Sequence, residues 1–537
     1  MDTRKHTMKH TATLAVTCLL IYVMPAGKAE AAAATNGHTA TAGHIMEEAL
    51  KSRDFEGASV SMLAINGAGD TLLCHDSGRL LIPASNMKLV TTALALHSLG
   101  GDYRYETRIG YCGTISDGIL EGDLYIIGGG DPTLGSRNRI AIPTDTLFVQ
   151  WERLLRQAGI SGIHGCIIGD GRFFSGMDEH PTWELCDAGT YYGTGASGLN
   201  FYENVQDFKV SAGAAPGDPV CIKSDYPESP WMEIMNSAVT GKAGTGNTLY
   251  FYPGGFAPVG EMRGTFAVDR KPKTESAANK FPEYTLAWYF TKYLSECGME
   301  CTGGPADLGP VFRPDRNSPV RSGMNETDGT GRHQGLQGYG DWAPAAQDSL
   351  KILGGTLSPT LAEIARVTNT DSNNLYAETL FKTLGKEYCG NGCYDSAAVA
   401  VRGLLEEIGA GDRRLRIRDG SGLSREDLLD AGFICTLLER MMVSPAFEDF
   451  FGSLPYPGGE GTLEYYMTTV PAETRQRIRM KSGSMGGVRC FSGYITPVTG
   501  AKEDAVIFSL MVNGFTAPLH RVQNHLFRII EALAVNP

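Results

Sequence analysis

The pattern of apolar and polar positions near the start of the chain predicts a helix, a hairpin and a second helix. Residues 40–52 are compatible with a short helix. The apolar runs 60–65 and 71–74 flank a turn-rich connection, which predicts a β-hairpin. Residues 87–99 carry apolar side chains at helical spacing, and two glycines follow them, so a helix is expected to end there.

The last third of the chain shows helices first and strands afterwards. The helical patterns cover 361–367, 375–384, 397–408 and 428–442. Strand-like runs follow at 478–480, 488–495 and 505–512, and a helical pattern near 520–533 ends the chain. We expect the two ends of the chain to build one antiparallel sheet flanked by helices, in an α/β (α+β) fold.

The middle of the chain is long and mixed. Two buried strands are expected at 123–127 and 165–168, and an amphipathic helix at 144–155. Two polar stretches, 269–280 and 312–347, lie within this middle region. The second is rich in turn-forming residues and predicts a long loop.

These patterns predict a discontinuous domain organisation. Residues 40–105 and 350–537 are expected to form one catalytic domain. Residues 106–349 would be an inserted region of two smaller subdomains.

The N-terminus has the layout of a secretory signal peptide, which would comprise residues 1–31. Basic residues precede an apolar run at 13–24, and Ala29-Glu30-Ala31 offers a small-x-small cleavage site. The run is shorter than the roughly 20 apolar residues that a membrane-spanning helix needs. We therefore expect an exported, periplasmic protein that is soluble after cleavage and has no stable membrane anchor.

Composition narrows the class of protein further. Hydrophobic residues make up 42% of the chain and charged residues 20%, which excludes a disordered polymer. The formal net charge is -13, with 60 acidic and 47 basic residues. A nucleic-acid partner is therefore not expected.

The twelve cysteines leave two interpretations open. Cys297 and Cys301, and likewise Cys389 and Cys393, are separated by three residues, so local disulfides and buried apolar thiols are both compatible with the sequence. Neither CxxC nor HExxH spacing occurs, and we expect no metal and no cofactor.

Ser85 and Lys88 are the first candidate catalytic pair. They form the only Ser-x-x-Lys in the chain and lie where a loop enters the predicted helix 87–99. Positions i and i+3 share a helix face, so a desolvated, neutral Lys88 could serve as the base for a Ser85 nucleophile. The alternative is a capping serine with a solvated lysine.

Two further short motifs lie at element boundaries. Ser372-Asn373-Asn374 precedes a helical pattern and could equally be a helix cap. Lys481-Ser482-Gly483 follows a strand-like run, and Gly483 leaves room for a ligand backbone beside an edge strand, although an ordinary turn would also explain it.

Together the three motifs resemble those of the penicillin-recognising acyl-serine enzymes. Further stretches at 122–134, 372–380, 419–425 and 461–463 resemble the D-alanyl-D-alanine carboxypeptidase/endopeptidase family of class C low-molecular-mass penicillin-binding proteins. The resemblance implies the penicillin-recognising acyl-serine transferase fold with a large insertion between the first two motifs. It also implies a serine DD-peptidase acting on peptidoglycan peptides and inhibited by β-lactam antibiotics.

The resemblance assigns catalytic roles to residues of all three motifs. Ser85 would attack the D-Ala-D-Ala carbonyl, and Lys88 would take its proton. Ser372 would relay a proton to the departing amine. The backbone N–H groups of Ser85 and Ser484 would form the oxyanion hole.

The resemblance also assigns substrate-binding roles. Asn374 would bind the substrate amide. Lys481, with Ser482, would hold the terminal carboxylate, and Gly483 would border the substrate.

A subsite for the stem peptide's side chain is implied as well. Asp187 and Arg425 match positions that contact the charged side chain of the diamino acid, and Tyr192 would line the same subsite. For Asp187 and Arg425, a structural ion pair is the alternative.

Two other functions stay open on the sequence alone. A β-lactamase would share the fold but needs fast deacylation as well as acylation. A wall-binding protein with decayed catalytic machinery would keep the fold without the reaction.

Overall fold

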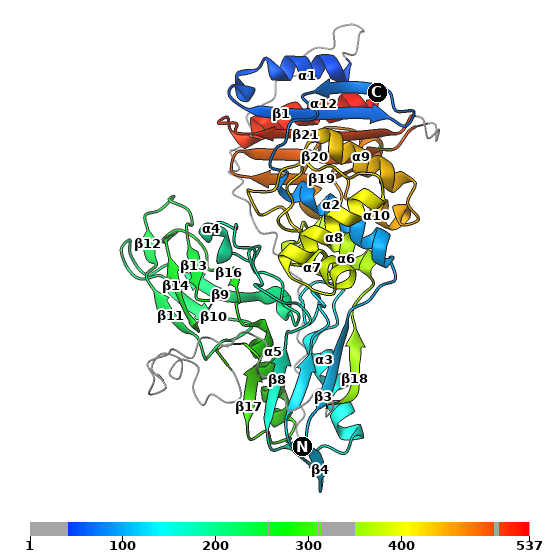
Figure 1. Ribbon diagram of the computed structural model, residues 1–537. Coiled ribbons are helices and arrows are strands. Elements are labelled where there is room, and N and C mark those ends of the chain that lie inside the picture. Colours follow the sequence, from blue (N-terminus) through cyan, green and yellow to red (C-terminus); the bar gives the residue numbers. More distant parts are fainter. Residues whose placement is uncertain (1–40, 256, 310, 313–349, 499–503, 536–537) are drawn as a thin grey trace, which may run out of the picture. The chain divides into compact units, whose positions relative to one another are not determined.

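The computed structural model describes residues 41–255, 257–309, 311–312, 350–498 and 504–535 (Figure 1). The predicted signal peptide and nearly all of the predicted 312–347 loop lie outside these residues. Within the described part of the chain, no helix combines the length and the apolar character that crossing a bilayer requires.

The two ends of the described chain meet in one five-stranded antiparallel sheet, as the sequence predicts (Figure 1). Its spatial order is β19 (Ile478–Met485), β20 (Val488–Ile495), β21 (Val506–Asn513), β1 (Ser59–Asn66) and β2 (Thr71–His75). β1 pairs along its whole length with β21 and thereby joins the N-terminal hairpin to the C-terminal strands. β19 is an edge strand of this sheet.

Alternate side chains of the central strands enter two different hydrophobic clusters. Cys490, Ile507 and Met511 belong to the first cluster, and their neighbours Phe491 and Phe508 belong to the second. Successive side chains of a strand point to opposite faces of the sheet. The continuous burial of β20 and β21 therefore means that both faces of the sheet are covered.

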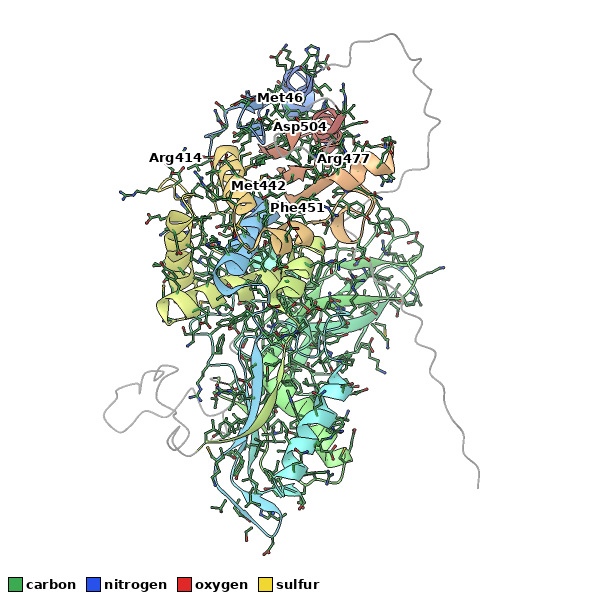
Figure 2. All side chains as sticks on the ribbon, turned by 90° about the vertical axis from the view of Figure 1, so that its right-hand side faces the viewer. Met46, Arg414, Met442, Phe451, Arg477 and Asp504 are labelled. Carbon is green, nitrogen blue, oxygen red and sulfur yellow. The ribbon has the colours of Figure 1, made fainter. Side chains whose placement is uncertain are left out.

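Helices cover these two faces. α1 (Ala42–Leu50) and α12 (Leu519–Val535) contribute to the second cluster, in which Met46 of α1 takes part (Figure 2). α2 (Met87–Leu99) and α9 (Ala431–Met442) contribute to the first.

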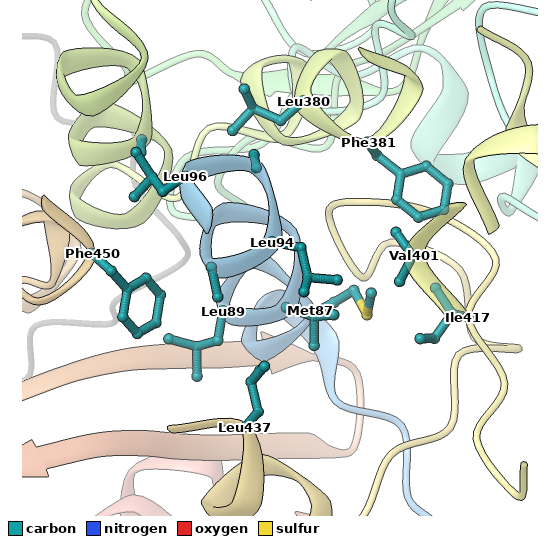
Figure 3. Close-up of a cluster of buried hydrophobic side chains, with 14 of the residues drawn as sticks. Met87, Leu89, Leu94, Leu96, Leu380, Phe381, Val401, Ile417, Leu437 and Phe450 are labelled. Carbon is teal, nitrogen blue, oxygen red and sulfur yellow. The ribbon is translucent and has the colours of Figure 1, made fainter. Parts of the chain in front are cut away.

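α2 is buried on all sides rather than on one face. Every residue from Met87 to Leu96 is buried. The helix ends at Gly100, which has φ 82°. The predicted bounds 87–99 are thus confirmed. Figure 3 shows the side chains of α2 surrounded by residues of several other segments, among them Leu380, Phe381, Val401, Ile417, Leu437 and Phe450.

Three further helices confirm the predicted stretches 361–367, 375–384 and 397–408, namely α6 (Leu361–Thr370), α7 (Asn374–Cys389) and α8 (Tyr394–Glu407). The short helices α10 (Phe447–Ser453) and α11 (Ala472–Arg477) are not predicted from the sequence. α9 begins at Ala431 rather than at 428 because Asp430 caps it, with its carboxylate accepting from the Phe433 N–H at 2.7 Å.

The middle of the chain contains a second five-stranded sheet. Its order is β17 (Gly304–Asp307), β8 (Cys166–Asp170), β6 (Leu124–Ile127), β3 (Glu106–Tyr111) and β18 (Lys351–Leu357). α3 (Thr144–Gln157) and α5 (Pro282–Glu296) pack in one cluster with side chains of this sheet. The two predicted buried strands and the amphipathic helix are confirmed.

Four smaller sheets complete the described middle region. One holds β10 (Cys221–Ser224), β9 (Val205–Ser211) and β16 (Lys273–Ala278). Another holds β11 (Glu233–Asn236), β14 (Val259–Arg263) and β13 (Tyr250–Pro253). The others are β12 (Val239–Gly241) with β15 (Thr265–Ala267), and β4 (Thr114–Ser116), β5 (Ile119–Glu121) and β7 (Gly162–Ile163). The polar stretch 269–280 thus contains a strand.

The closely spaced cysteines form neither of the two expected arrangements. Cys297, Cys301, Cys389 and Cys393 are free thiols, and none of the four is fully buried. Cys435 and Cys490, by contrast, are buried apolar thiols in the first cluster.

Candidate active site

Ser85 lies in a single helical turn, η2 (Ala84–Asn86), that leads directly into α2. Ala84 has φ 46°, a left-handed conformation that costs a non-glycine residue free energy and is often found at functional sites. Asn86 is buried and donates from Nδ2 to Ser492 Oγ in β20 at 2.7 Å. This bond ties the turn to the sheet and leaves Ser85 half-buried beside the N-terminus of α2.

Lys88 lies one helical turn after Ser85 and is fully buried. Its Nζ donates to Ser85 Oγ at 3.0 Å, to Asn374 Oδ1 at 2.7 Å and to the Ser421 carbonyl at 2.9 Å. The solvated lysine of the alternative interpretation is therefore excluded. The first two motifs meet at this amine.

Burial is the main cause of the unusual ionisation of Lys88. Desolvation lowers the pKa of its amine to about 7, and the charges of Glu378 and Asp419 oppose this shift. A lysine with this pKa is neutral about half of the time near pH 7 and can then accept a proton.

Ser372 stands just before α7 and is not its capping residue. The cap is Asn373, whose side chain accepts from the Tyr376 N–H at 3.1 Å. Ser372 has φ 58°, and its half-buried hydroxyl accepts from Lys481 Nζ at 2.9 Å. In this motif Asn373 is therefore the helix cap, and the Ser372 hydroxyl is left for the predicted catalytic role.

Lys481 connects the third motif to the second, because its amine donates to Ser372. It is fully buried in β19 and also donates to the Ser482 carbonyl at 2.9 Å. Burial lowers the pKa of Lys481 well below its ordinary value, and the charges of Lys88 and Arg489 lower it further. A buried amine of this kind gains a favourable partner when an anionic group binds beside it.

Gly483 lets the edge strand approach the turn that carries Ser85. A Cβ at this position would lie 2.6 Å from the Pro83 carbonyl oxygen and 3.2 Å from the Ser85 nitrogen. The protein's own backbone therefore requires the glycine here. Ser482 is buried, whereas Ser484 on the same strand is half-buried.

The residues of the predicted side-chain subsite lie close together, and each has a polar partner in the structure. Asp187 lies in α4 (Leu185–Ala188) and accepts from Tyr192 OH at 3.1 Å. Arg425 forms its ion pair with Glu184, at 2.9 Å between Nε and Oε1. Burial raises the pKa of Asp187, and the Tyr192 hydrogen bond opposes this.

This subsite connects to the catalytic motifs through Asn374. The Nδ2 of Asn374 donates to the backbone carbonyl of Tyr192 at 2.9 Å, while its Oδ1 accepts from Lys88. One amide side chain therefore contacts both Lys88 and the segment that carries Asp187 and Tyr192.

Two buried carboxylates near Lys88 were not identified as site residues from the sequence. Glu378 accepts from the Gly420 and Ser421 N–H groups at 3.0 and 2.8 Å. Asp419 accepts two further N–H groups of the same turn, at 2.7 Å each. Together they order the turn that presents the Ser421 carbonyl to Lys88. The signal available in the sequence was the spacing of four residues between Asn374 and Glu378.

One group of side chains has the composition of a metal site. Glu184, Cys186 and Asp187 place ligand atoms within 4.8 Å of one another. Glu184 and Cys186 are exposed, and the two carboxylates already bind Arg425 and Tyr192. These contacts account for the cluster without a metal.

The sequence and the fold both match known proteins. The D-Ala-D-Ala carboxypeptidase 3 (S13) family matches residues 43–305 and 342–529. A D-alanyl-D-alanine carboxypeptidase of Actinomadura sp. (strain R39) is 29% identical over 485 residues, which cover 87% of this chain and 80% of that protein. D-alanyl-D-alanine carboxypeptidase DacB of Haemophilus influenzae is 21% identical, with 88% of this chain and 91% of that protein covered.

The structural likeness shows the same fold. The crystal structure of penicillin binding protein 4 (dacB) from Haemophilus influenzae superimposes with a TM-score of 0.72 at 20% identity. The match covers 90% of this chain and 97% of that one. Because the family match spans most of the sequence, the chain belongs to the D-Ala-D-Ala carboxypeptidase 3 (S13) family.

Proposed function

We propose that the chain is a serine D-Ala-D-Ala peptidase that forms an acyl-enzyme on Ser85 and acts on peptidoglycan stem peptides. The observation that carries the proposal is the buried Lys88 amine, which contacts Ser85 Oγ and has its pKa lowered to about 7. Family membership and the names of the relatives support the same reaction.

Acylation begins with proton transfer from Ser85 to neutral Lys88. The Ser85 oxygen attacks the carbonyl carbon of the penultimate D-Ala and forms a tetrahedral intermediate. The N–H groups of Ser85 and Ser484 stabilise its oxyanion, and the N-terminus of α2 adds positive potential.

Collapse of the intermediate breaks the peptide C–N bond. Ser372, which accepts a hydrogen bond from Lys481, relays to the departing D-Ala amine the proton that Lys88 took from Ser85, which leaves Lys88 neutral again. Asn374 binds the substrate amide. The Lys481 amine and the Ser482 hydroxyl hold the terminal carboxylate, while Gly483 keeps the edge strand close to the catalytic turn.

Deacylation uses water. A water molecule gives a proton to neutral Lys88 and attacks the Ser85 ester. Lys88 then returns that proton to the Ser85 oxygen as the ester bond breaks, which releases the shortened peptide and restores the serine. A β-lactam acylates the same serine, and the Haemophilus influenzae relative was crystallised in complex with a β-lactam.

The side-chain subsite would recognise the diamino acid of the stem peptide. Asp187 offers a carboxylate to a side-chain ammonium group, Tyr192 lines the subsite, and Arg425 offers a cation to an acidic group. The Arg425 pair with Glu184 leaves the guanidinium more than a third exposed.

Location and domain organisation complete the proposal. Residues 1–31 would direct export to the periplasm and be removed there. Residues 40–105 and 350–537 would form the catalytic domain, and 106–349 the inserted region.

The test combines stable labelling with product release. The wild-type protein should retain a fluorescent penicillin for many minutes and release D-Ala from a stem peptide. Ser85→Ala should do neither, whereas Ser98→Ala, the matched change at the far end of α2, should do both. Rapid penicillin turnover would favour a β-lactamase. Muropeptide binding without labelling or D-Ala release would establish a decayed wall-binding protein.

A further inference from the structure

One face of α7 carries a row of polar side chains, of which Glu378 and Lys382 are buried. Asn374, Glu378 and Lys382 are spaced by four residues, which places them on the same side of the helix. Asn374 contacts Lys88 directly. Glu378 orders the turn whose Ser421 carbonyl also contacts Lys88. The catalytic steps proposed above leave Lys382 without a role.

Lys382 is fully buried and donates its hydrogen bonds to neutral groups. Its Nζ donates to the Ala196 carbonyl at 2.7 Å and to the Met177 carbonyl at 3.1 Å. The amine also lies over the rings of Phe174 and Tyr394, at 5.1 and 5.4 Å from their centroids. Burying an amine is costly unless such contacts compensate for the lost water.

The Met177 carbonyl directly precedes a loop, residues 178–196, and the Ala196 carbonyl lies at the other end of that loop. The Ala196 N–H also donates to the Asp178 carbonyl at 2.9 Å, which joins these ends to each other. The Asp178 carboxylate lies 4.0 Å from the Lys382 amine and adds an ion pair at the same place. Lys382 therefore fixes both ends of the 178–196 loop at one point on α7.

The 178–196 loop carries the side-chain subsite. It contains Asp187 and Tyr192, and the Tyr192 carbonyl accepts from Asn374 on the same helix. Asn374 and Lys382 are about 12 Å apart along the helix axis, at 1.5 Å per residue. One helix thus holds the loop at its base and beside the catalytic lysine.

We propose that Lys382 is a positioning residue for recognition of a cationic side chain in the stem peptide. By fixing the ends of the 178–196 loop, it sets where Asp187 and Tyr192 stand relative to Ser85. The ligand of this subsite is the side-chain ammonium of the stem peptide, as in the proposed function, and the new element is the residue that positions the loop. This inference rests on the proposed function.

The test compares two peptides in several variants of the full chain. N-acetyl-Lys-D-Ala-D-Ala and its norleucine analogue differ only in the side-chain amine, and the ratio of their kcat/KM values cancels any general loss of activity. The variants are Lys382→Met, Lys382→Gln and the matched control Lys386→Met, one turn further along α7. Circular dichroism and melting verify that each variant is folded.

Wild type and Lys386→Met should prefer the lysine peptide to the same degree. In Lys382→Met the ratio should fall about tenfold, mainly through KM, as expected for a displaced binding group. Lys382→Gln, which keeps a shorter donor, should be intermediate, and it decides the question if Lys382→Met does not fold. The proposal is overturned if a folded Lys382 variant keeps the wild-type ratio, or if wild type shows no preference.

Failure of the proposed function looks different. In that case the wild-type protein would neither be labelled by penicillin nor release D-Ala from either peptide.

Discussion

The rate at which penicillin acylates this protein should rise with pH through about 7 and then level off. Only the neutral form of Lys88 can accept the Ser85 proton, and burial lowers the pKa of that amine to about 7. Raising the pH deprotonates the amine, so the rate follows the neutral fraction upward.

The size of the change in acylation rate follows from the lowered pKa of Lys88. With its ordinary pKa of 10.5, about one lysine in 3,000 would be neutral at pH 7, whereas with a pKa of about 7 about half are neutral. Burial thus supplies roughly a thousandfold more of the active base at neutral pH. The acylation rate should be about a tenth of its plateau at pH 6 and about nine tenths at pH 8.

The assay is labelling by a fluorescent penicillin, sampled over time between about pH 5.5 and 8.5. Circular dichroism at each pH ensures that the protein stays folded, and a protein-free sample corrects for spontaneous penicillin hydrolysis. A flat profile across this range, or a rate that still rises about tenfold per pH unit up to about pH 8.5 with no plateau, would refute the role of Lys88 as a buried neutral base.

Three further changes test other parts of the account. Gly483→Ala should destabilise the fold by about 1–3 kcal/mol and slow acylation, because its Cβ would meet the Pro83 carbonyl at 2.6 Å; unchanged labelling kinetics would contradict this. Leu94→Ala, which truncates a fully buried side chain of α2 (Figure 3), should cost about 2–5 kcal/mol in urea unfolding, and a loss below about 1 kcal/mol would mean that the core is loosely packed. Lys481→Met should lower kcat/KM about 10- to 100-fold more for a peptide with a free C-terminal carboxylate than for its amide, and an equal loss for both would exclude carboxylate binding.

Local patterns predict the elements that are fixed by neighbours in sequence. The helix at Met87–Leu99 is predicted with its observed bounds because Gly100 ends it within the same stretch. The hairpin and the C-terminal strands are predicted because each is an apolar run bounded by polar or turn-forming residues. The start of α9 is misplaced by three residues, since the capping bond of Asp430 decides it.

The sequence identifies the motif residues but not the polar groups that position them. Ser85, Lys88 and Lys481 stand out by spacing and by resemblance. Glu378 and Lys382 look like ordinary charged positions on a helix, because their partners lie in distant segments of the chain. Only the fold reveals that these charges are buried.

The sequence likewise does not predict which polar groups pair in the side-chain subsite. For Asp187 and Arg425 the sequence leaves substrate contact and a surface or structural ion pair open. In the structure Arg425 forms an ion pair with Glu184, and Asp187 accepts a hydrogen bond from Tyr192. Four nearby charged and polar groups can pair in several ways, and only the fold shows which pairs form.

The most direct test of the central claim is peptide mapping of the penicillin adduct by mass spectrometry. The account predicts one added penicilloyl mass on the peptide that contains Ser85, with fragmentation placing it on that residue. An adduct on another serine, or complete absence of an adduct on the folded protein, would contradict it.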